Sequence, residues 1–413
     1  MSDSRSRQAK PVAAIARHGR LRRRNPIGAI FKLLAGALSV LLISGAAVGA
    51  VALSQLDAGI DTVELVGQEE GAPPPDIGSF EGGFNVLLVG SDRCEDDSGC
   101  HGRGSANLND VTILVHVSQD QTNAVAVSFP RDLVVPIPSC PREDGKGNNR
   151  SMSGQPINVT LFYGGLPCTV LTVEALTGLD IPFAGLITFN GVVNMSSAIG
   201  GVTVCTTGPV VDRYSGINLP SAGEWPLQGH DALAFLRSRH GVGDGSDLGR
   251  ISSQQVFMSA MARQLTSDGV LKDPVKLYNL ATTATRSMQL SSSMKNVTTL
   301  ASMARVFAGM DLSNVKFVQY PSTTGVGGIY LGKVAPIERK ADELFKLIRA
   351  DLPFTLTEGN TGRGSVLNPD APADPVTPET PPVDGAAPPA DVAVLSGVQG
   401  QSAADHTCSK ANN

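Results

Sequence analysis

One uncharged stretch, from Leu33 to Leu53, constrains this chain more than any other feature. It is long enough to cross a bilayer, because a membrane-spanning helix needs about 20 apolar residues. The residues before Asn25 carry eight basic side chains against a single acid, Asp3. By the positive-inside rule the basic end stays in the cytoplasm and the chain after Gln55 lies outside. We therefore expect a cytoplasmic tail over residues 1–26, a single-pass membrane anchor over 27–55 and an extracytoplasmic stem over 56–80.

A cleaved signal peptide is the competing interpretation, since Ala50 and Ala52 are small residues of the kind found at cleavage sites. The apolar run exceeds the roughly 7–15 residues of a signal peptide's apolar region, which favours an uncleaved anchor. The basic tail beside a membrane span is most simply an orientation and lipid-headgroup signal. With 5 tyrosines and 1 tryptophan, the chain has few aromatic residues for base stacking, which argues against nucleic-acid binding.

Residues 81–355 are numerous enough for one large domain with a substantial core. Apolar stretches typical of strands alternate there with helical patterns, which predicts a three-layer α/β arrangement. Helices are expected over residues 252–266, 274–289, 294–308 and 335–350. The segment 356–413 is rich in Pro, Ala and Asp, a composition typical of a disordered or extended tail.

Six cysteines, all beyond the apolar stretch, form an even set that suits disulfides in an oxidising compartment. Cys94 and Cys100 bracket a short acidic loop, and Cys140 and Cys168 bracket the next long insertion. The remaining pair, Cys205 with Cys408, would tie the far C-terminal segment to the domain, as one of 15 possible connectivities. Zinc binding is the alternative, but no CxxC or Cys-His pair at ligand spacing supports it.

Three guanidinium groups and the carboxylate of Asp247 gather between Leu236 and Arg250. Arg237 and Arg239 precede a glycine-rich loop, and Asp247 and Arg250 follow it. Arginine presents a rigid fork of donors that pairs with phosphate oxygens in bidentate fashion. Three such forks predict a pyrophosphate site. The competing interpretation is structural: Asp247 would cap a helix, and the arginines would form solvated ion pairs.

A second charged group follows three apolar stretches that read as strands, Phe84–Val89, Val111–Val117 and Val125–Phe129. Their ends carry Asp92, Asp110, Arg131 and Asp132. Two carboxylates near arginines suit a hard cation such as Mg²⁺, which takes one or two carboxylates together with substrate phosphate oxygens. The two charged groups together would complement a metal diphosphate.

The ordered motifs NVLLVGSD, NDVTILVHV, AVSFPRDLVVPIP, INVTLFYGG and LQGHDALAFLRSRHGVGDGSDLGR resemble the LytR-CpsA-Psr family. The resemblance covers roughly Phe84 to Leu265, and it is weaker to about Leu352. It implies an α/β/α sandwich with a central mixed sheet, preceded by one transmembrane helix. It also implies a phosphotransferase that moves a glycopolymer, in the actinobacterial branch often arabinogalactan, from a polyprenyl diphosphate lipid onto a peptidoglycan hydroxyl through a phosphodiester.

Carried over motif by motif, the resemblance implies that Asp92 and Asp110 hold Mg²⁺ or Mn²⁺. It assigns the diphosphate and the chemistry to Arg131, Arg237, Arg239, Asp247 and Arg250, with Asp247 as a support for the arginines or as acceptor of the hydroxyl proton. Further substrate contacts are expected from Arg93, Arg103, Asp132, His240 and Gln254.

The chain departs from the family pattern at three places. Leu108 and Asn109 stand before Asp110 where many members have Arg-Ser, so one basic contact is missing unless Arg93 or Arg103 replaces it. Ser253 stands where a second arginine often precedes the glutamine, and Pro156 stands where a lysine is common. These changes concern substrate preference.

Two other functions compete with the transferase. A pyrophosphatase acting on the same lipid diphosphate would use an identical site with water as acceptor. A non-catalytic binder of lipid-linked wall precursors is the third hypothesis, but a pure binder would not need the paired carboxylates Asp92 and Asp110.

Overall fold

The computed structural model describes residues 60–67, 82–93, 107–267, 274–295, 297–357, 359–371 and 392–412. All of them belong to one compact unit that extends from Gln55 to Asn413. The predicted tail (1–26) and anchor (27–55) lie outside the described residues, as does the stem (56–80) except for 60–67. Within the described part, one helical segment, Ile157–Thr177, has the length and hydropathy of a membrane span. It is mostly buried in the domain, as a core helix is, and it does not overlap the predicted anchor.

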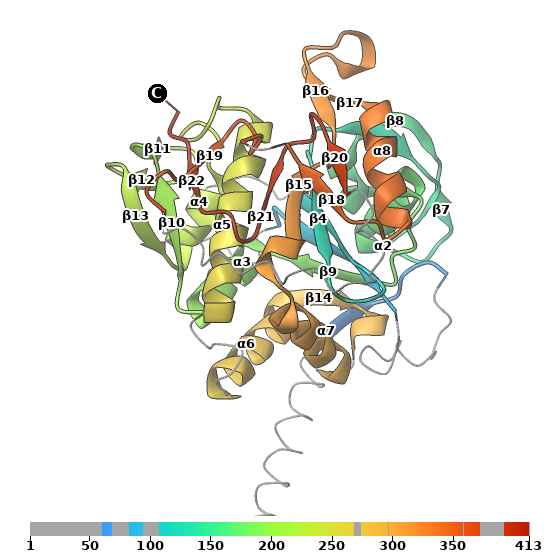
Figure 1. Cartoon of the computed structure of the whole chain (residues 1–413). Coiled ribbons are helices and arrows are strands. Elements are labelled where there is room, and N and C mark those ends of the chain that lie inside the picture. The colour runs from blue at the N-terminus through green and yellow to red at the C-terminus, as the bar shows by residue number, and fades with distance from the viewer. Residues whose placement is uncertain are drawn as a thin grey trace, which may run out of the picture. The chain divides into compact units, whose positions relative to one another are not determined.

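An eight-stranded sheet forms the centre of the domain (Figure 1). Its strands, in order across the sheet, are β1 (Asp61–Val63), β14 (Met288–Ser291), β9 (Phe183–Ile187), β2 (Phe84–Ser91), β3 (Asn109–Val117), β4 (Ala124–Phe129), β15 (Val315–Gln319) and β21 (Gly400–Ser402). The pairs β1–β14, β9–β2 and β4–β15 are parallel and the other neighbours are antiparallel. The mixed sheet confirms the α/β class, and β2, β3 and β4 confirm the three predicted strands.

Helices pack against both faces of this sheet. On one face α2 (Thr160–Thr177) and α8 (Glu338–Arg349) share a core with Leu87 of β2 and Val127 of β4. On the other face α7 (Val297–Gly309) packs on β2, and α5 (Asp247–Ser267) packs on β3 and β4. Because both faces are covered, every residue of β4 is buried, which explains its continuous apolar run.

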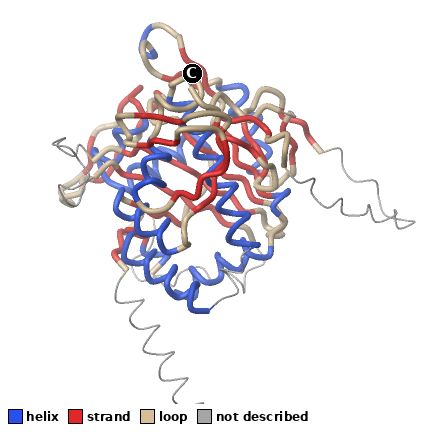
Figure 2. The backbone as a smooth tube through the Cα atoms, turned by 90° about the vertical axis from the view of Figure 1, so that its left-hand side faces the viewer, coloured by secondary structure: helices blue, strands red, loops and turns tan. Residues whose placement is uncertain are grey.

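The predicted helices begin and end close to the expected residues. The range 252–266 corresponds to α5, 274–289 to α6 (Pro274–Ser287) followed by β14, 294–308 to α7, and 335–350 to α8. Two shorter helices, α3 (Phe189–Ala198) and α4 (His230–Arg237), lie near α6 and α5. Figure 2 views the domain from the side that carries this region.

A second sheet, of four strands, has its own apolar core against α4 and α5. Its order is β13 (Gly223–Leu227), β10 (Val202–Thr206), β22 (Thr407–Ser409) and β19 (Ser365–Leu367). Five two-stranded pairs complete the domain: β5 (Val134–Ile137) with β8 (Met152–Pro156), β6 (Cys140–Pro141) with β7 (Asn148–Asn149), β11 (Val210–Asp212) with β12 (Ile217–Leu219), β16 (Ser322–Thr324) with β17 (Val334–Pro336), and β18 (Phe354–Leu356) with β20 (Ala393–Leu395).

Two of the three expected disulfides lie within the described residues and both are formed. Cys140 is bonded to Cys168 and Cys205 to Cys408. The Cys205–Cys408 bond joins β10 to β22, which are neighbours in the second sheet. Cys94 and Cys100 lie outside the described residues.

The structure differs from the expected tail over 356–413. Its Pro-rich middle, 372–391, lies outside the described residues, but both flanks are folded. β21 extends the central sheet beside β15, and β22 pairs with β10 and β19 in the second sheet. Composition missed these strands because each has only three residues and its stability comes from partners far away in the sequence.

Candidate functional site

The charged residues that follow the three predicted strands meet at one edge of the central sheet. β2 and β3 are antiparallel, with Ser91 opposite Asn109, so the end of β2 lies beside the start of β3. β4 is antiparallel to β3 and places Phe129 opposite Thr112 at the same edge. Asp92, Asp110 and Arg131, from segments about 20 residues apart, are therefore brought together by strand register alone.

Arg131 is the centre of this edge. Its Nη1 donates to Asp110 Oδ1 at 2.5 Å, and its Nε lies 3.6 Å from Asp132 Oδ2. Asp132 is in turn paired with Lys333 Nζ at 3.0 Å. Sequence reasoning missed Lys333, which comes from the segment before β17 and has no charged motif around it. Asp132, predicted as a substrate contact, thus holds Arg131 and Lys333.

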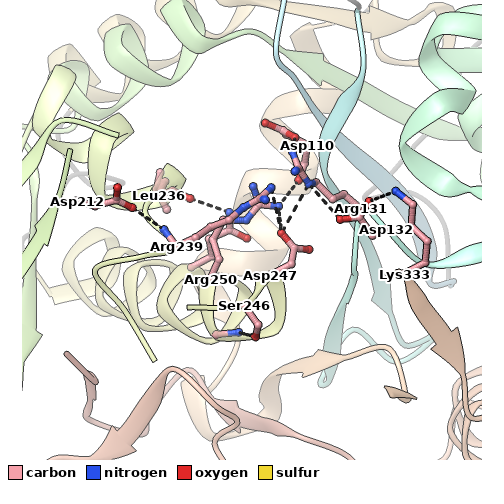
Figure 3. Close-up of polar contacts among 12 residues, drawn as sticks. Asp110, Arg131, Asp132, Asp212, Leu236, Arg239, Ser246, Asp247, Arg250 and Lys333 are labelled. Carbon is pink, nitrogen blue, oxygen red and sulfur yellow. Dashed lines mark hydrogen bonds and ion pairs between the residues drawn. The ribbon is translucent and has the colours of Figure 1, made fainter. Parts of the chain in front are cut away.

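Asp247, at the start of α5, lies among three arginines (Figure 3). Its Oδ1 lies 2.8 Å from Arg250 Nη2, 3.4 Å from Arg239 Nη2 and 3.9 Å from Arg131 Nε. Arg250 also donates from Nη2 to the backbone carbonyl of Asp110 at 2.7 Å. Asp247 and Arg250 therefore join the two groups that the sequence suggested separately.

Asp247 does not cap α5, contrary to the structural alternative raised for it. Ser246 fills that role, because its Oγ accepts a hydrogen bond from the backbone N–H of Gly249 at 3.2 Å. The carboxylate of Asp247 is left to face the arginines, and its observed role is to hold three guanidinium groups close together.

The segment after α4 is fixed by a buried carboxylate that the sequence did not single out, Asp212 at the end of β11. Its Oδ2 accepts from the backbone N–H of Arg239 at 2.9 Å and of His240 at 3.0 Å, and from Ser238 Oγ at 3.1 Å. Its Oδ1 accepts from the N–H of Tyr214 at 2.9 Å. Burial raises the pKa of Asp212, but these hydrogen bonds outweigh it and hold the pKa below its ordinary value.

Two cavities adjoin at the arginines. A polar pocket of about 210 Å³ is lined by Asp110, Arg131, Asp212, Tyr214, Ser215, Arg237, Arg239, His240 and Arg250. An apolar cavity of about 390 Å³ lies between β2–β3 and helices α3 to α6, with walls that include Leu88, Ile113, Val192 and Met258. Asp110, Arg237 and Arg250 line both. Arg237 also lies over the ring of Phe189, another wall of the apolar cavity, at 4.2 Å from its centroid.

The polar pocket holds an excess of positive charge. Four arginines line it, against the carboxylates of Asp110 and Asp212 in its wall and of the neighbouring Asp247. Burial and repulsion by Arg250 lower the pKa of Arg239. In the described part of the chain, the buried Nε atoms of Arg131 and Arg250 have no hydrogen-bond acceptor. An anion with several oxygens would supply those acceptors and relieve the repulsion.

Four predicted substrate contacts remain. His240 lines the polar pocket. Gln254 lines the apolar cavity, but its Nε2 donates to the carbonyl of Leu236 at 2.9 Å, so it supports the end of α4. Arg93 is exposed and lines neither cavity. Arg103 lies outside the described residues.

The two carboxylates expected to hold a metal suit a hard divalent cation. Burial and repulsion by Asp110 raise the pKa of Asp92 even though its Oδ1 accepts from the N–H of Leu108. Burial acts in the same direction on Asp110, but the charges of Arg250 and Arg131 outweigh it and lower the pKa of that carboxyl. A cation between the carboxylates would offset their repulsion, and oxygen ligands are those that Mg²⁺ prefers.

Fold and site together define an α/β protein in which an arginine-lined polar pocket adjoins an apolar cavity. The sequence model of the LytR_cpsA_psr family matches residues 61–346. The chain therefore belongs to the LytR-CpsA-Psr family, which confirms the resemblance read from its motifs.

Relatives and solved structures agree with this assignment. The cell wall biosynthesis protein LcpA of Corynebacterium glutamicum is 29% identical over 71% of this chain, which spans 60% of that relative's length. The polyisoprenyl-teichoic acid–peptidoglycan teichoic acid transferase TagT of Bacillus subtilis is 25% identical over 78% of this chain and 94% of its own. The crystal structure of protein gbs0355 from Streptococcus agalactiae, 20% identical over 66% of this chain and 88% of its own, has the same fold with a TM-score of 0.52.

Proposed function

We propose that this protein is a membrane-anchored phosphotransferase that moves a glycopolymer from a polyprenyl diphosphate lipid onto peptidoglycan through a phosphodiester bond. One observation carries the proposal: the apolar cavity and the arginine pocket adjoin, and share Asp110, Arg237 and Arg250. A ligand that fills both must be apolar along one part and polyanionic at the other. A polyprenyl diphosphate has this form.

The arginines supply the chemistry that phosphoryl transfer needs most, which is positioning and neutralisation of charge. An acceptor hydroxyl oxygen on peptidoglycan forms a bond to the phosphorus that bears the sugar. The bond from that phosphorus to the bridging oxygen breaks, polyprenyl phosphate leaves, and the hydroxyl proton passes to a carboxylate or to water. Arg131, Arg239 and Arg250 converge where the negative charge develops, and their fixed donors stabilise it without reorganisation.

Asp247 acts on this step through the arginines, because its carboxylate lies within 4 Å of three of them. Asp92 and Asp110 would hold Mg²⁺ or Mn²⁺. When bound, the ion would neutralise charge on the diphosphate oxygens. Arg131 would then hold Asp110 in place through the hydrogen bond between them.

The relatives support the transfer of a cell-wall polymer. The name of TagT describes transfer of teichoic acid from a polyisoprenyl carrier to peptidoglycan, and LcpA is a cell wall biosynthesis protein. The likeness to an actinobacterial relative favours arabinogalactan as the polymer here. The two disulfides and the basic tail before the apolar stretch favour a catalytic domain on the outer side of the membrane.

The test incubates the full chain in detergent with a polyprenyl-diphosphate oligosaccharide, Mg²⁺ and a peptidoglycan fragment, and follows the products by mass spectrometry. We expect a phosphodiester-linked conjugate that disappears in Asp110→Ala and Arg239→Ala. Release of sugar phosphate without a conjugate would instead establish the pyrophosphatase. Tight binding with intact substrate would establish the non-catalytic binder.

A further inference from the structure

Two aromatic side chains, Tyr214 and His240, stand at the mouth of the polar pocket and form what we call the aromatic rim. Both line that pocket. Their ring centroids are 4.7 Å apart with planes inclined by 43°. The Tyr214 side chain is well exposed, at 53% for the residue, and the His240 side chain is 62% exposed. Two exposed rings in contact beside a cluster of arginines are unusual for a structural role, because neither contributes to a core.

The aromatic rim is held rigidly to the phosphate-binding residues. The carboxylate of Asp212 accepts hydrogen bonds from the backbone N–H groups of Tyr214, Arg239 and His240. Arg213 adds a second restraint, because its guanidinium lies 4.8 Å from the centroid of the Tyr214 ring and its Nη2 donates to the phenol oxygen at 2.8 Å. A single buried acid therefore fixes the backbone of both rim residues beside that of Arg239 before any ligand binds.

The positions of the two cavities indicate which part of a bound ligand reaches the aromatic rim. Asp110, Arg237 and Arg250 line both cavities, whereas Tyr214 and His240 line the polar pocket alone. A ligand with its apolar chain in the apolar cavity and its diphosphate on the arginines must extend its next chemical group into the part of the pocket that the rim borders. In a polyprenyl-diphosphate glycopolymer, the next group is a sugar ring.

We propose that the aromatic rim is a pyranose-binding subsite of this active site, which rests on the proposed function. The C–H face of the sugar would pack on the Tyr214 ring, because tyrosine offers an apolar face with a polar edge. Ser215 and His240, which line the same pocket, would meet the sugar hydroxyls. The sugar is either the first residue of the donor polymer or the ring that carries the acceptor hydroxyl, since both must approach the same phosphorus.

The test compares two ligands on the full chain in detergent: a polyprenyl diphosphate, and the same lipid carrying N-acetylglucosamine. Tyr214→Ala should weaken binding of the sugar-bearing lipid roughly tenfold, which corresponds to a loss of about 1.4 kcal/mol of aromatic packing. Its affinity for the sugar-free lipid should not change. Tyr214→Phe keeps the ring and should bind both lipids as the unchanged protein does.

A matched control is Phe162→Ala, which removes another exposed aromatic ring that is packed on a neighbour, Tyr163, but that lines neither of the two cavities. It should leave both affinities unchanged. If Tyr214→Ala leaves donor binding unchanged but raises the KM for a peptidoglycan fragment at saturating donor, the subsite holds the acceptor sugar.

If Tyr214→Ala alters neither affinity nor acceptor KM, the subsite does not exist, although the phosphotransferase stands. If the unchanged protein binds neither lipid, the proposed function itself is wrong and the subsite is lost with it.

Discussion

The two halves of the site are supported in different ways. The sheet half, with Asp92, Asp110 and Arg131, lies at the ends of hydrogen-bonded neighbouring strands. The loop half, with Arg237, Arg239 and Asp247, extends from the last residue of α4 to the first residue of α5, and no strand of the central sheet carries it. One half is positioned by a continuous backbone ladder, whereas the other depends on a few separate contacts: the side chains of Asp212 and Asn412 and one isolated bridge between Val242 and Ala411.

The residues that make the contacts with the loop half come from distant parts of the chain. Asp212 holds the backbone of Arg239 and His240, and Asn412 donates from Nδ2 to the carbonyl of His240 at 2.9 Å. The N–H of Gly243 donates to the carbonyl of Lys410 at 2.8 Å. Paired strands keep their backbone hydrogen bonds when any one side chain is removed. A loop held by a few contacts moves when one of them is removed. Substitutions that damage the site through its scaffold should therefore concentrate on the loop half.

The largest effect is expected where the halves meet. Arg250→Ala removes the hydrogen bond to the Asp110 carbonyl and the closest ion pair of Asp247. Transfer should fall on the order of 10³-fold, because a preorganised donor to the developing charge is lost. The measurement is the initial rate of conjugate formation at saturating donor.

Arg339→Ala is the matched control, since Arg339 is paired with Glu343 at 3.2 Å on the exposed surface of α8. It should change the rate less than twofold. A similar rate loss in both variants would mean that general surface charge, and not the junction, drives catalysis.

The second largest effect is expected for Asp212, whose carboxylate holds the backbone of the loop half. Asp212→Asn removes a charged acceptor and turns an amide N–H₂ toward backbone donors, so the free energy of unfolding should fall by about 2–4 kcal/mol at pH 7. Transfer should fall roughly 10–100-fold, while the sheet half keeps its geometry. Urea unfolding and hydrogen exchange of residues 238–245 measure the two quantities. Exchange that stays slow in this loop would show that Asp212 does not hold it.

The difference in stability between the native protein and Asp212→Asn should also depend on pH. The pKa of Asp212 is below its ordinary value of 3.8 in the folded protein, so the unfolded chain binds the proton more readily. The stability from its ionised form is complete above pH 3.8 and is lost as the pH falls through the lower folded-state pKa. The stability gap between the native protein and Asp212→Asn should be constant from pH 5 to 7 and shrink below pH 3.8.

The smallest effect is expected for Lys333, which pairs with Asp132 beside the sheet half. Lys333→Met breaks the ion pair with Asp132, but the lysine side chain is 40% exposed, and such pairs contribute about 0.5 kcal/mol. Activity should change less than threefold, as the initial rate of conjugate formation would show. A loss of activity of tenfold or more would place Lys333 among the phosphate-binding residues. The sheet half would then depend on single side chains as much as the loop half does.

The same contrast explains what the sequence predicted. Strand periodicity located β2, β3 and β4, and their ends contain Asp92, Asp110 and Arg131, so the sheet half followed from local pattern. The density of arginines indicated the loop half but not how it is held. Asp212 sits in an ordinary turn sequence, Asp-Arg-Tyr-Ser-Gly, and its partner Arg239 is 27 residues away.

Other features depended on contacts that no local pattern contains. The strands of the C-terminal segment are three residues long and lie on either side of a Pro-rich stretch, which gave them the composition of a tail. The apolar cavity is lined by the same residue types as a packed core, so only the arrangement of β2, β3 and helices α3 to α6 distinguishes the two.

The Cys205–Cys408 bond supports the site, and it also affects the stage of synthesis at which the site can be completed. Its cysteines are 203 residues apart, and Lys410 and Asn412 complete the loop half just beyond the second one. A chain that leaves the ribosome from its N-terminus presents the sheet half early, yet the loop half waits for residues 408–412. A polypeptide whose synthesis or export stops before residue 408 would therefore carry every arginine of the site and still lack the framework that holds half of them.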